Sequence, residues 1–159
     1  MLEYIKAGEF DRVVLLTSSD AALRTDALID GPQIRSISIN CDDRILIDRL
    51  QALSLTDFGQ RRGVAIADDM DSKESSLAGV LKQLHAVGIA RPLLDMCQEA
   101  GIPVLALVSL VNEGDNIADA IMLANAVNAA LGIATTIDQW RPPQSWQWLM
   151  PDNVPSELF

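Results

Sequence analysis

The residues from Pro103 to Leu131 constrain the fold of this chain more than any other segment. Pro103–Val111 is an almost continuous apolar run, which is typical of a strand that is buried on both faces of a sheet. Ile117–Leu131 repeats apolar residues at helical spacing, and Gly132 follows as a C-terminal stop. A buried strand that leads directly into such a helix predicts an α/β protein.

The turn between this strand and this helix is acidic. It contains Glu113, Gly114, Asp115 and Asn116, and Asp119 follows in the first helical turn. Asp115 or Asn116 can accept hydrogen bonds from the free amides of the helix, and the negative charges suit the positive end of its dipole. A metal or acid–base site is the alternative, but no second ligand cluster and no nucleophile with a nearby base accompanies these carboxylates. We therefore interpret the turn as structural.

Helices and strands alternate along the rest of the chain. The patterns predict helices at 2–10, 43–53, 75–87 and 91–100, and strands at 12–17, 34–39 and 64–66, with a polar linker at 56–63 and an acidic loop at 68–74. Strands separated by helices of this length indicate parallel strands with crossover helices. We predict a layered α/β domain with a mainly parallel sheet over residues 1–138, and a Trp- and Pro-rich segment over 139–159.

Composition excludes several classes of protein. The chain has 159 residues, 49% of them hydrophobic, and a formal net charge of −10, which argues against nucleic acid and anionic membranes as partners. No apolar run reaches the roughly 18 residues that a membrane helix needs. Cys41 and Cys97 have no paired spacing, so we expect no disulfide and a reducing compartment, the cytoplasm or the nucleus.

The sequence offers little support for a catalytic centre or a cofactor. His85 is the only histidine, whereas a catalytic triad or a zinc site needs further partners around it. The acidic run at 68–74 lacks the glycine and the distal glutamate of a calcium-binding loop. No glycine pattern for binding phosphate occurs. We predict a protein that is not an enzyme and holds no metal or cofactor.

The three tryptophans of the chain, Trp140, Trp146 and Trp148, lie close together beside two prolines. They either strap an extended segment across the domain, where large amphipathic rings are buried, or serve as anchors of a protein interface. Both interpretations stay open. Two apolar residues, Leu158 and Phe159, end the sequence and are further candidates for binding a partner.

Two segments carry a resemblance to a known family. The run EGDNIADA at 113–120, with the helix that ends in AALGI, resembles a motif of proteasome assembly chaperone 2. The segment from Trp140 to the terminal Leu158 and Phe159, with its Pro-Pro and Ser-Trp pairs, is similar to the closing pattern of that family. The whole chain resembles the later part of the family's domain, whose first strands have no counterpart in this sequence.

This resemblance implies a non-enzymatic protein with an α/β/α, phosphorylase-like sandwich fold. It implies pairing with proteasome assembly chaperone 1 and binding to the α-subunit ring of the 20S proteasome during assembly. Related proteins insert tails that end in a hydrophobic residue, tyrosine and any residue between α subunits. Leu158 stands where that tyrosine would be, so insertion would rely on Leu158, Phe159 and the terminal carboxylate.

The alternative from another class is a phosphorylase- or hydrolase-like enzyme, because one fold supports many functions. Such an enzyme would need a pocket that brings Glu113 or Asp115 together with His85 or an arginine. Binding of a nucleoside or of phosphate would favour it.

Overall fold

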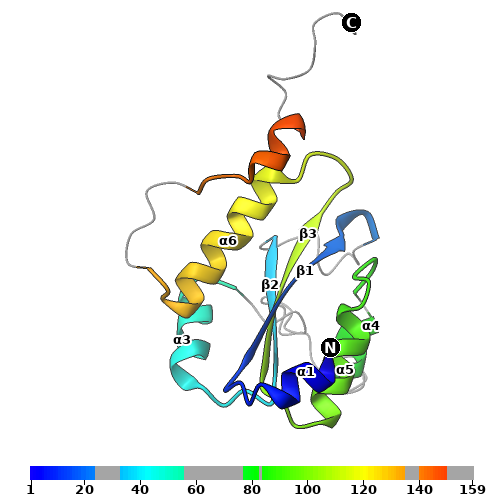
Figure 1. Cartoon of the computed structure of the whole chain (residues 1–159), viewed down its shortest axis with the longest axis vertical. Helices are drawn as coiled ribbons and strands as arrows, with labels where there is room; N and C mark the ends of the chain where they lie inside the picture. The colour runs from blue at the N-terminus through cyan, green and yellow to red at the C-terminus, as the bar shows by residue number, and fades with distance from the viewer. Residues whose placement is uncertain (24–32, 56–76, 83, 135–139, 150–159) are drawn as a thin grey trace, which may run out of the picture.

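The central strand of the structure is β3 (Val104–Val111), the apolar run that the sequence singles out. Figure 1 shows the computed structural model, which describes residues 1–23, 33–55, 77–82, 84–134 and 140–149. The predicted linker at 56–63, the strand at 64–66, the acidic loop at 68–74 and the terminal Leu158 and Phe159 lie outside the described residues.

The other described helices and strands follow the predicted order closely. They are α1 (Leu2–Ala7), β1 (Val13–Asp20), the 3-10 helix η1 (Ala21–Leu23), β2 (Ile34–Ile39), α3 (Arg44–Ala52), α4 (Leu77–Lys82), α5 (Ala90–Glu99), α6 (Ile117–Leu131) and the 3-10 helix η2 (Gln144–Leu149). None of these helices is long and apolar enough to cross a membrane.

In the described residues the strands form one sheet in the order β1-β3-β2. β1 runs parallel to β3, with Val13 opposite Val104, whereas β2 runs antiparallel, with Ile37 opposite Ala106. The protein is of the α/β class as predicted, but this part of the sheet is mixed rather than mainly parallel. The apolar pattern of β2 predicts burial and carries no information on direction, which its pairing with β3 decides.

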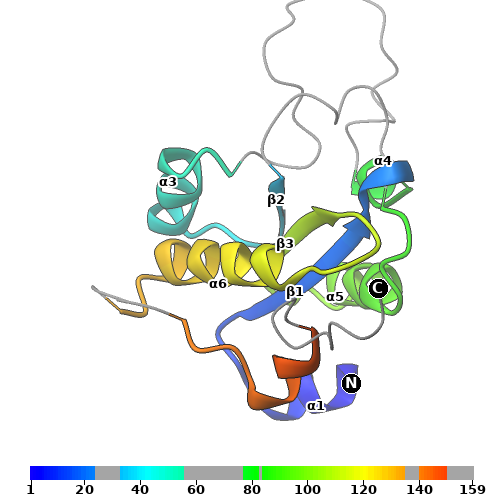
Figure 2. The ribbon, with the colours of Figure 1, turned by 90° about the horizontal axis from the view of Figure 1, so that it is seen from above.

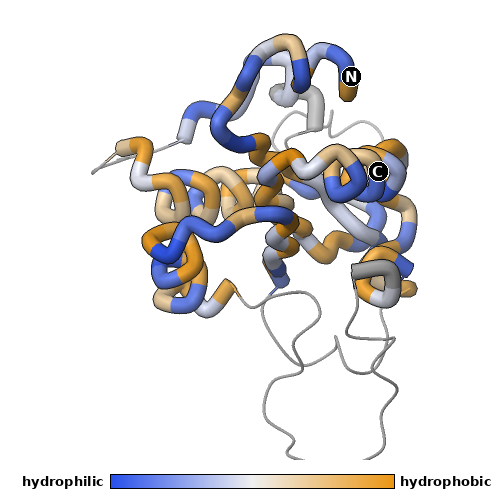
Figure 3. The backbone as a smooth tube through the Cα atoms, turned by 90° about the horizontal axis from the view of Figure 1, so that it is seen from below, coloured by the Kyte–Doolittle hydropathy of each residue, from blue (hydrophilic) through white to orange (hydrophobic). Residues whose placement is uncertain are grey.

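The core forms two clusters, one on each face of the sheet. Alternate residues of β3 point to opposite faces, as in any strand. Val104, Ala106, Val108 and Leu110 join the cluster with α4 and α5, and Leu105 and Leu107 join the cluster with α3 and α6. Figure 2 shows these two pairs of helices on opposite sides of the strands, and apolar stretches recur in each pair (Figure 3).

β3 is buried on both of its faces in this arrangement. Its residues from Val104 to Leu110 are all buried, and Leu105 and Leu107 have no exposed surface. Burying a leucine or valine side chain stabilises a fold by about 1.5 to 3 kcal/mol. A strand that contributes such side chains to both clusters is therefore the main support of the fold.

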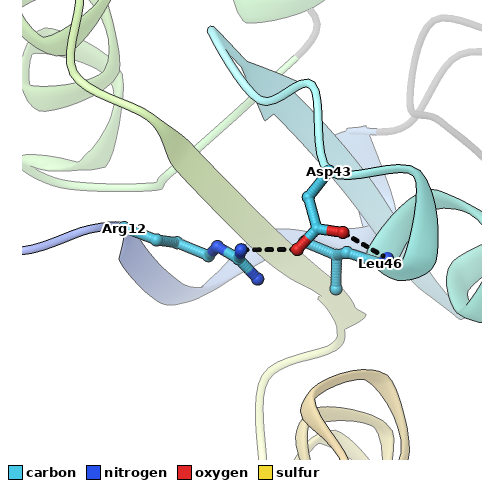
Figure 4. A network of polar contacts seen from close by, with 3 residues as sticks. All are labelled: Arg12, Asp43 and Leu46. Carbon is cyan, nitrogen blue, oxygen red and sulfur yellow. Dashed lines mark hydrogen bonds and ion pairs between the residues drawn. The ribbon is translucent and has the colours of Figure 1, made fainter.

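An ion pair connects the start of β1 to the start of α3. Asp43 is the N-cap of α3, and its Oδ1 accepts a hydrogen bond from the Leu46 amide at 3.1 Å. Its Oδ2 lies 2.6 Å from Nη2 of Arg12 (Figure 4). The Leu46 amide, and after it the Arg12 guanidinium, lower the pKa of the Asp43 carboxyl. One carboxylate thus caps a helix and orients it against a strand.

The helix predicted at 75–87 ends earlier in the structure, where α4 stops at Lys82. Beyond it, the carbonyl oxygen of His85 accepts hydrogen bonds from the Asp20 amide at 3.1 Å and the Ser19 hydroxyl at 2.9 Å. These bonds to β1 replace those that a longer helix would have made. His85 consequently does not lie on the helix where the apolar spacing placed it.

The prediction for α5 is confirmed, with Pro92 in its first turn, where a missing amide costs nothing. Leu94 and Cys97 of this helix have no exposed surface. Cys97 and Cys41 are both free thiols, and burial raises the pKa of the Cys97 thiol. Cys97 therefore behaves as a small apolar core residue.

We expect the melting temperature to fall most in Asp43→Ala and less in Asp43→Asn. Alanine loses both the cap and the ion pair, whereas asparagine keeps an oxygen that can cap the helix. Because folding lowers the carboxyl pKa from its ordinary 3.8, the advantage of wild type over Asp43→Asn is full above that value. It disappears as the pH falls through the lowered pKa. Thermal melts between pH 2 and 7 measure this, and a constant difference across that range would contradict it.

Candidate functional site

The turn after β3 has the structural role that the sequence predicts. Oδ1 of Asp115 accepts a hydrogen bond from the Ile117 amide at 3.0 Å. Asn116 is the N-cap residue of α6 but makes no capping bond through its side chain. Of the two residues that the sequence offered as acceptors for the free helix amides, Asp115 is therefore the one that accepts such a bond. Gly114 has a φ of 132° with open space around its Cβ position. It is therefore needed for its backbone conformation and not for lack of room.

Some residues of the EGDN turn only face solvent, whereas others line a hollow of the surface. Glu113, Gly114 and Asp115 are exposed. Asn116 and Asp119 line an open hollow of about 240 Å³ between α6 and the ends of β1 and β3. The other residues of its wall are Leu16, Thr17, Ser18, Ser109, Val111, Ala120 and Leu123. Asp119 also stands in the first turn of α6, where its charge suits the helix dipole.

This hollow does not contain the groups that the enzyme alternative requires. Its wall includes neither Glu113, Asp115 nor His85, and no arginine. Its serine and threonine hydroxyls have no imidazole beside them to act as a base, although a hydroxyl nucleophile needs one. Within the described ranges, no group of three or more His, Cys, Asp or Glu residues could hold a metal ion. The wall of the hollow consists of apolar side chains, hydroxyl groups, one amide and one carboxylate, that of Asp119.

His85 and Asp119 approach the sheet from opposite faces. Ser19 shares a face of β1 with Val13 and Leu15, which pack against the cluster of α4 and α5, and Ser19 bonds the backbone of His85. Leu16 and Ser18 alternate with those residues and face α6 and Asp119. The backbone of His85 is therefore bound on the opposite side of β1 from the hollow, and His85 is absent from the wall around Asp119.

The C-terminal segment lies along the outer side of α6. Nε1 of Trp140 donates a hydrogen bond to Oδ1 of Asn125 at 2.6 Å. Trp140 and Trp146 are half-buried and line a second hollow, of about 130 Å³, with Ile121 and Ala124 of α6. These two rings therefore act as a strap on the domain. Trp148 lies in η2, and its side chain is outside the described part.

One polar residue inside the fold had no signal in the sequence. Arg35 on β2 is 3% exposed, and its Nε has no hydrogen-bond partner within the part of the chain that the structure describes. Burial lowers the pKa of its guanidinium. A buried cation is costly when it is unpaired. Nothing in the sequence signals this burial, because apolar and polar residues alternate in β2 and an arginine at a polar position of such a strand is expected to face solvent.

Comparisons with known proteins give the evolutionary context of these features. No protein-family model matches the chain. Proteasome assembly chaperone 2 of Danio rerio is 27% identical over 166 aligned residues, which cover 100% of this chain and 60% of the relative. The protein of the same name from Homo sapiens is 24% identical over 167 residues with the same coverage. That from Nematostella vectensis is 30% identical over 133 residues, covering 84% of this chain and 52% of the relative.

The chain is thus similar, over its whole length, to proteins of one class, the proteasome assembly chaperones. Within this class the chain is related to the proteasome assembly chaperone 2 family, which confirms the resemblance carried by the EGDN turn and the Trp/Pro segment. The chain spans about 60% of the length of the Danio rerio and human relatives.

We expect Asp115 to carry most of the stabilisation that the turn provides. The double variant Asp115→Ala/Asn116→Ala should lower the free energy of unfolding by about 1 to 2 kcal/mol, because a helix loses its capping acceptor. Asp115→Ala alone should account for nearly all of this, and Asn116→Ala is the matched control with no capping bond to lose. Urea denaturation of the three variants measures the difference. A double variant of unchanged stability would contradict a structural role for the turn.

Proposed function

We propose that this protein is a proteasome assembly chaperone subunit that pairs with proteasome assembly chaperone 1 and binds the α-ring of the 20S proteasome during assembly. The observation that carries this proposal is the match to proteasome assembly chaperone 2 over 100% of the chain. The matched span includes both segments that carry the resemblance, the turn after β3 and the Trp/Pro segment on α6.

The proposal extends to the fold of the complete domain. We infer that the domain is an α/β/α, phosphorylase-like sandwich whose complete sheet is mainly parallel. The core clusters on both faces of the sheet support the layering, and the parallel pairing of β1 with β3 supports the direction. The antiparallel β2 would then be a minority strand.

We further propose that the protein acts by binding and not by catalysis. The wall of the hollow beside Asp119 has no imidazole or arginine, which supports a scaffold over a phosphorylase or hydrolase. The acidic charge of −10 suits partners with basic surfaces. Assembly of the proteasome would take place in the cytoplasm, with the nucleus as a second compartment.

Co-expression tests the proposal directly. The chain and proteasome assembly chaperone 1 should purify together in a 1:1 ratio. This complex should retain 20S α subunits and should not retain the α-rings of mature 20S particles. A second preparation is titrated with inosine and with inorganic phosphate. Binding of either small molecule, with no complex formed, would favour the enzyme alternative.

The terminal residues Leu158 and Phe159 give a sharper prediction for the α-ring. Burying both side chains in a partner's pocket contributes about 1.5 to 3 kcal/mol each before the cost of ordering the tail. Deleting them should therefore weaken retention of α subunits in the co-purification while leaving the chaperone heterodimer intact.

The matched control for this deletion is Ser156→Ala/Glu157→Ala, which changes the same tail without removing its apolar end. Thermal melts of both variants complete the test. If the deletion lowered the melting temperature and left α-subunit retention unchanged, the tail would be a structural part of this domain and insertion would be wrong.

A further inference from the structure

The chain that follows α6 turns back and runs along that helix. The Ala134 amide donates to Oδ1 of Asn128 at 2.9 Å, and Nδ2 of Asn128 donates to the Ala134 carbonyl at 3.2 Å. Nε1 of Trp140 then bonds Oδ1 of Asn125, about one turn closer to the start of α6. Trp146 lines the hollow at the first two turns of the helix. The contacts therefore proceed from the end of α6 to its beginning.

We call residues 140–149 the strap. Pro142 and Pro143 restrict its backbone torsions, and the Trp146 amide donates to the Pro143 carbonyl at 2.9 Å at the start of η2. Figure 1 shows η2 beside the start of α6, at the end of the domain where the turn after β3 enters the helix. Because α6 has 15 residues and is about 22 Å long, the strap holds the chain a full helix length away from where α6 ends.

The asparagines of α6 account for this path. Asn125 and Asn128 are the two asparagines inside an alanine-rich helix, although asparagine forms helices less readily than alanine. Both bond the returning chain, one at Trp140 and the other at Ala134. Their amides therefore serve the contact with the strap at some cost to helix propensity.

The strap also shortens the connection between the folded domain and the end of the tail. In sequence, Leu158 lies nine residues beyond the end of η2 and 24 residues beyond Ala134. The effective concentration of a group at the end of a flexible connection falls roughly as the −3/2 power of the length of that connection. On this scaling, a strap that is held on α6 raises the effective concentration of Leu158 at a site on a partner by about fourfold.

We propose that the strap is a positioning element for the tail and that the bond between Trp140 and Asn125 is its latch, an inference that rests on the proposed binding of Leu158 and Phe159 to the α-ring. The strap itself does not touch the α-ring in this role. It fixes the end of the domain from which the tail departs and reduces the length of chain that must be ordered when the tail binds.

Intrinsic fluorescence tests the latch, because all three tryptophans of the chain, at 140, 146 and 148, lie in the strap. Asn125→Ala removes the acceptor of Trp140 and improves the helix propensity of α6. The emission should therefore move to longer wavelength while far-UV circular dichroism shows that the helices are kept. Asn125→Asp retains an acceptor oxygen and should restore the wild-type emission. An emission that is the same in all three proteins would contradict the latch.

Binding of α subunits by the complex with proteasome assembly chaperone 1 tests the positioning role. Trp140→Ala/Trp146→Ala, which releases the strap, should raise the apparent Kd by about fourfold, and Asn125→Ala should raise it less. Met122→Ala is the matched control, because this α6 side chain is 42% exposed and lines neither hollow. In chains that lack Leu158 and Phe159, the strap variants should cause no further loss, since the strap acts through the tail.

A longer connection with an intact strap provides a second variant that leaves the tryptophans in place. Inserting about 15 Gly and Ser residues between Asp152 and Asn153 lengthens the connection to about the value that applies without the strap. The apparent Kd should again rise by about fourfold, and the fluorescence should stay that of wild type.

The outcomes separate this inference from the proposed function. If deletion of Leu158 and Phe159 weakens binding while the strap variants and the insertion do not, the positioning role is wrong and the proposed function stands. Equal weakening by the strap variants with and without Leu158 and Phe159 would assign the strap to the fold or to direct contact, and would also overturn the role. Failure of the wild-type chain to bind proteasome assembly chaperone 1 or α subunits would overturn both proposals.

Discussion

The burial of β3 on both faces is the constraint on which the rest of the structure depends. Val104, Val108 and Leu110 contribute to one core, and Leu105 and Leu107 to the other. The described helices that cover the sheet, α3, α4, α5 and α6, each pack against one of these clusters. The turn after β3 matters because it redirects the chain from this strand onto α6 within a few residues, and Asp115 secures that change of direction by bonding the first helical amide.

The arrangement of polar groups supports the proposal that the protein acts by binding. The carboxyl ends of β1 and β3 form the edge at which α/β enzymes commonly place their ligands. Here that edge carries Asp119, Asn116 and hydroxyl groups beside apolar side chains, and the single histidine of the chain is not part of it. Chemistry that requires an acid, a base and a nucleophile in one place is not assembled by these described residues, whereas contact with another protein requires only a complementary surface.

Surfaces suited to such contact occur on two sides of α6. On one side, Trp140 and Trp146 fasten the C-terminal segment to the helix, which brings that part of the chain close to the domain before the terminal residues begin. On a neighbouring face of the helix lies the hollow that contains Asp119, and Ala120 lines both hollows.

The sequence alone determined the secondary structure and the class of the fold. The apolar run of β3, the helical spacing of α6 and the left-handed Gly132 after it are local signals, and local hydrogen bonding and burial decide them. The resemblance in the EGDN turn and the Trp/Pro segment likewise needs no coordinates. Tertiary structure decided the direction of β2, the early end of α4 and the burial of Arg35, because each depends on contacts with residues distant in the chain.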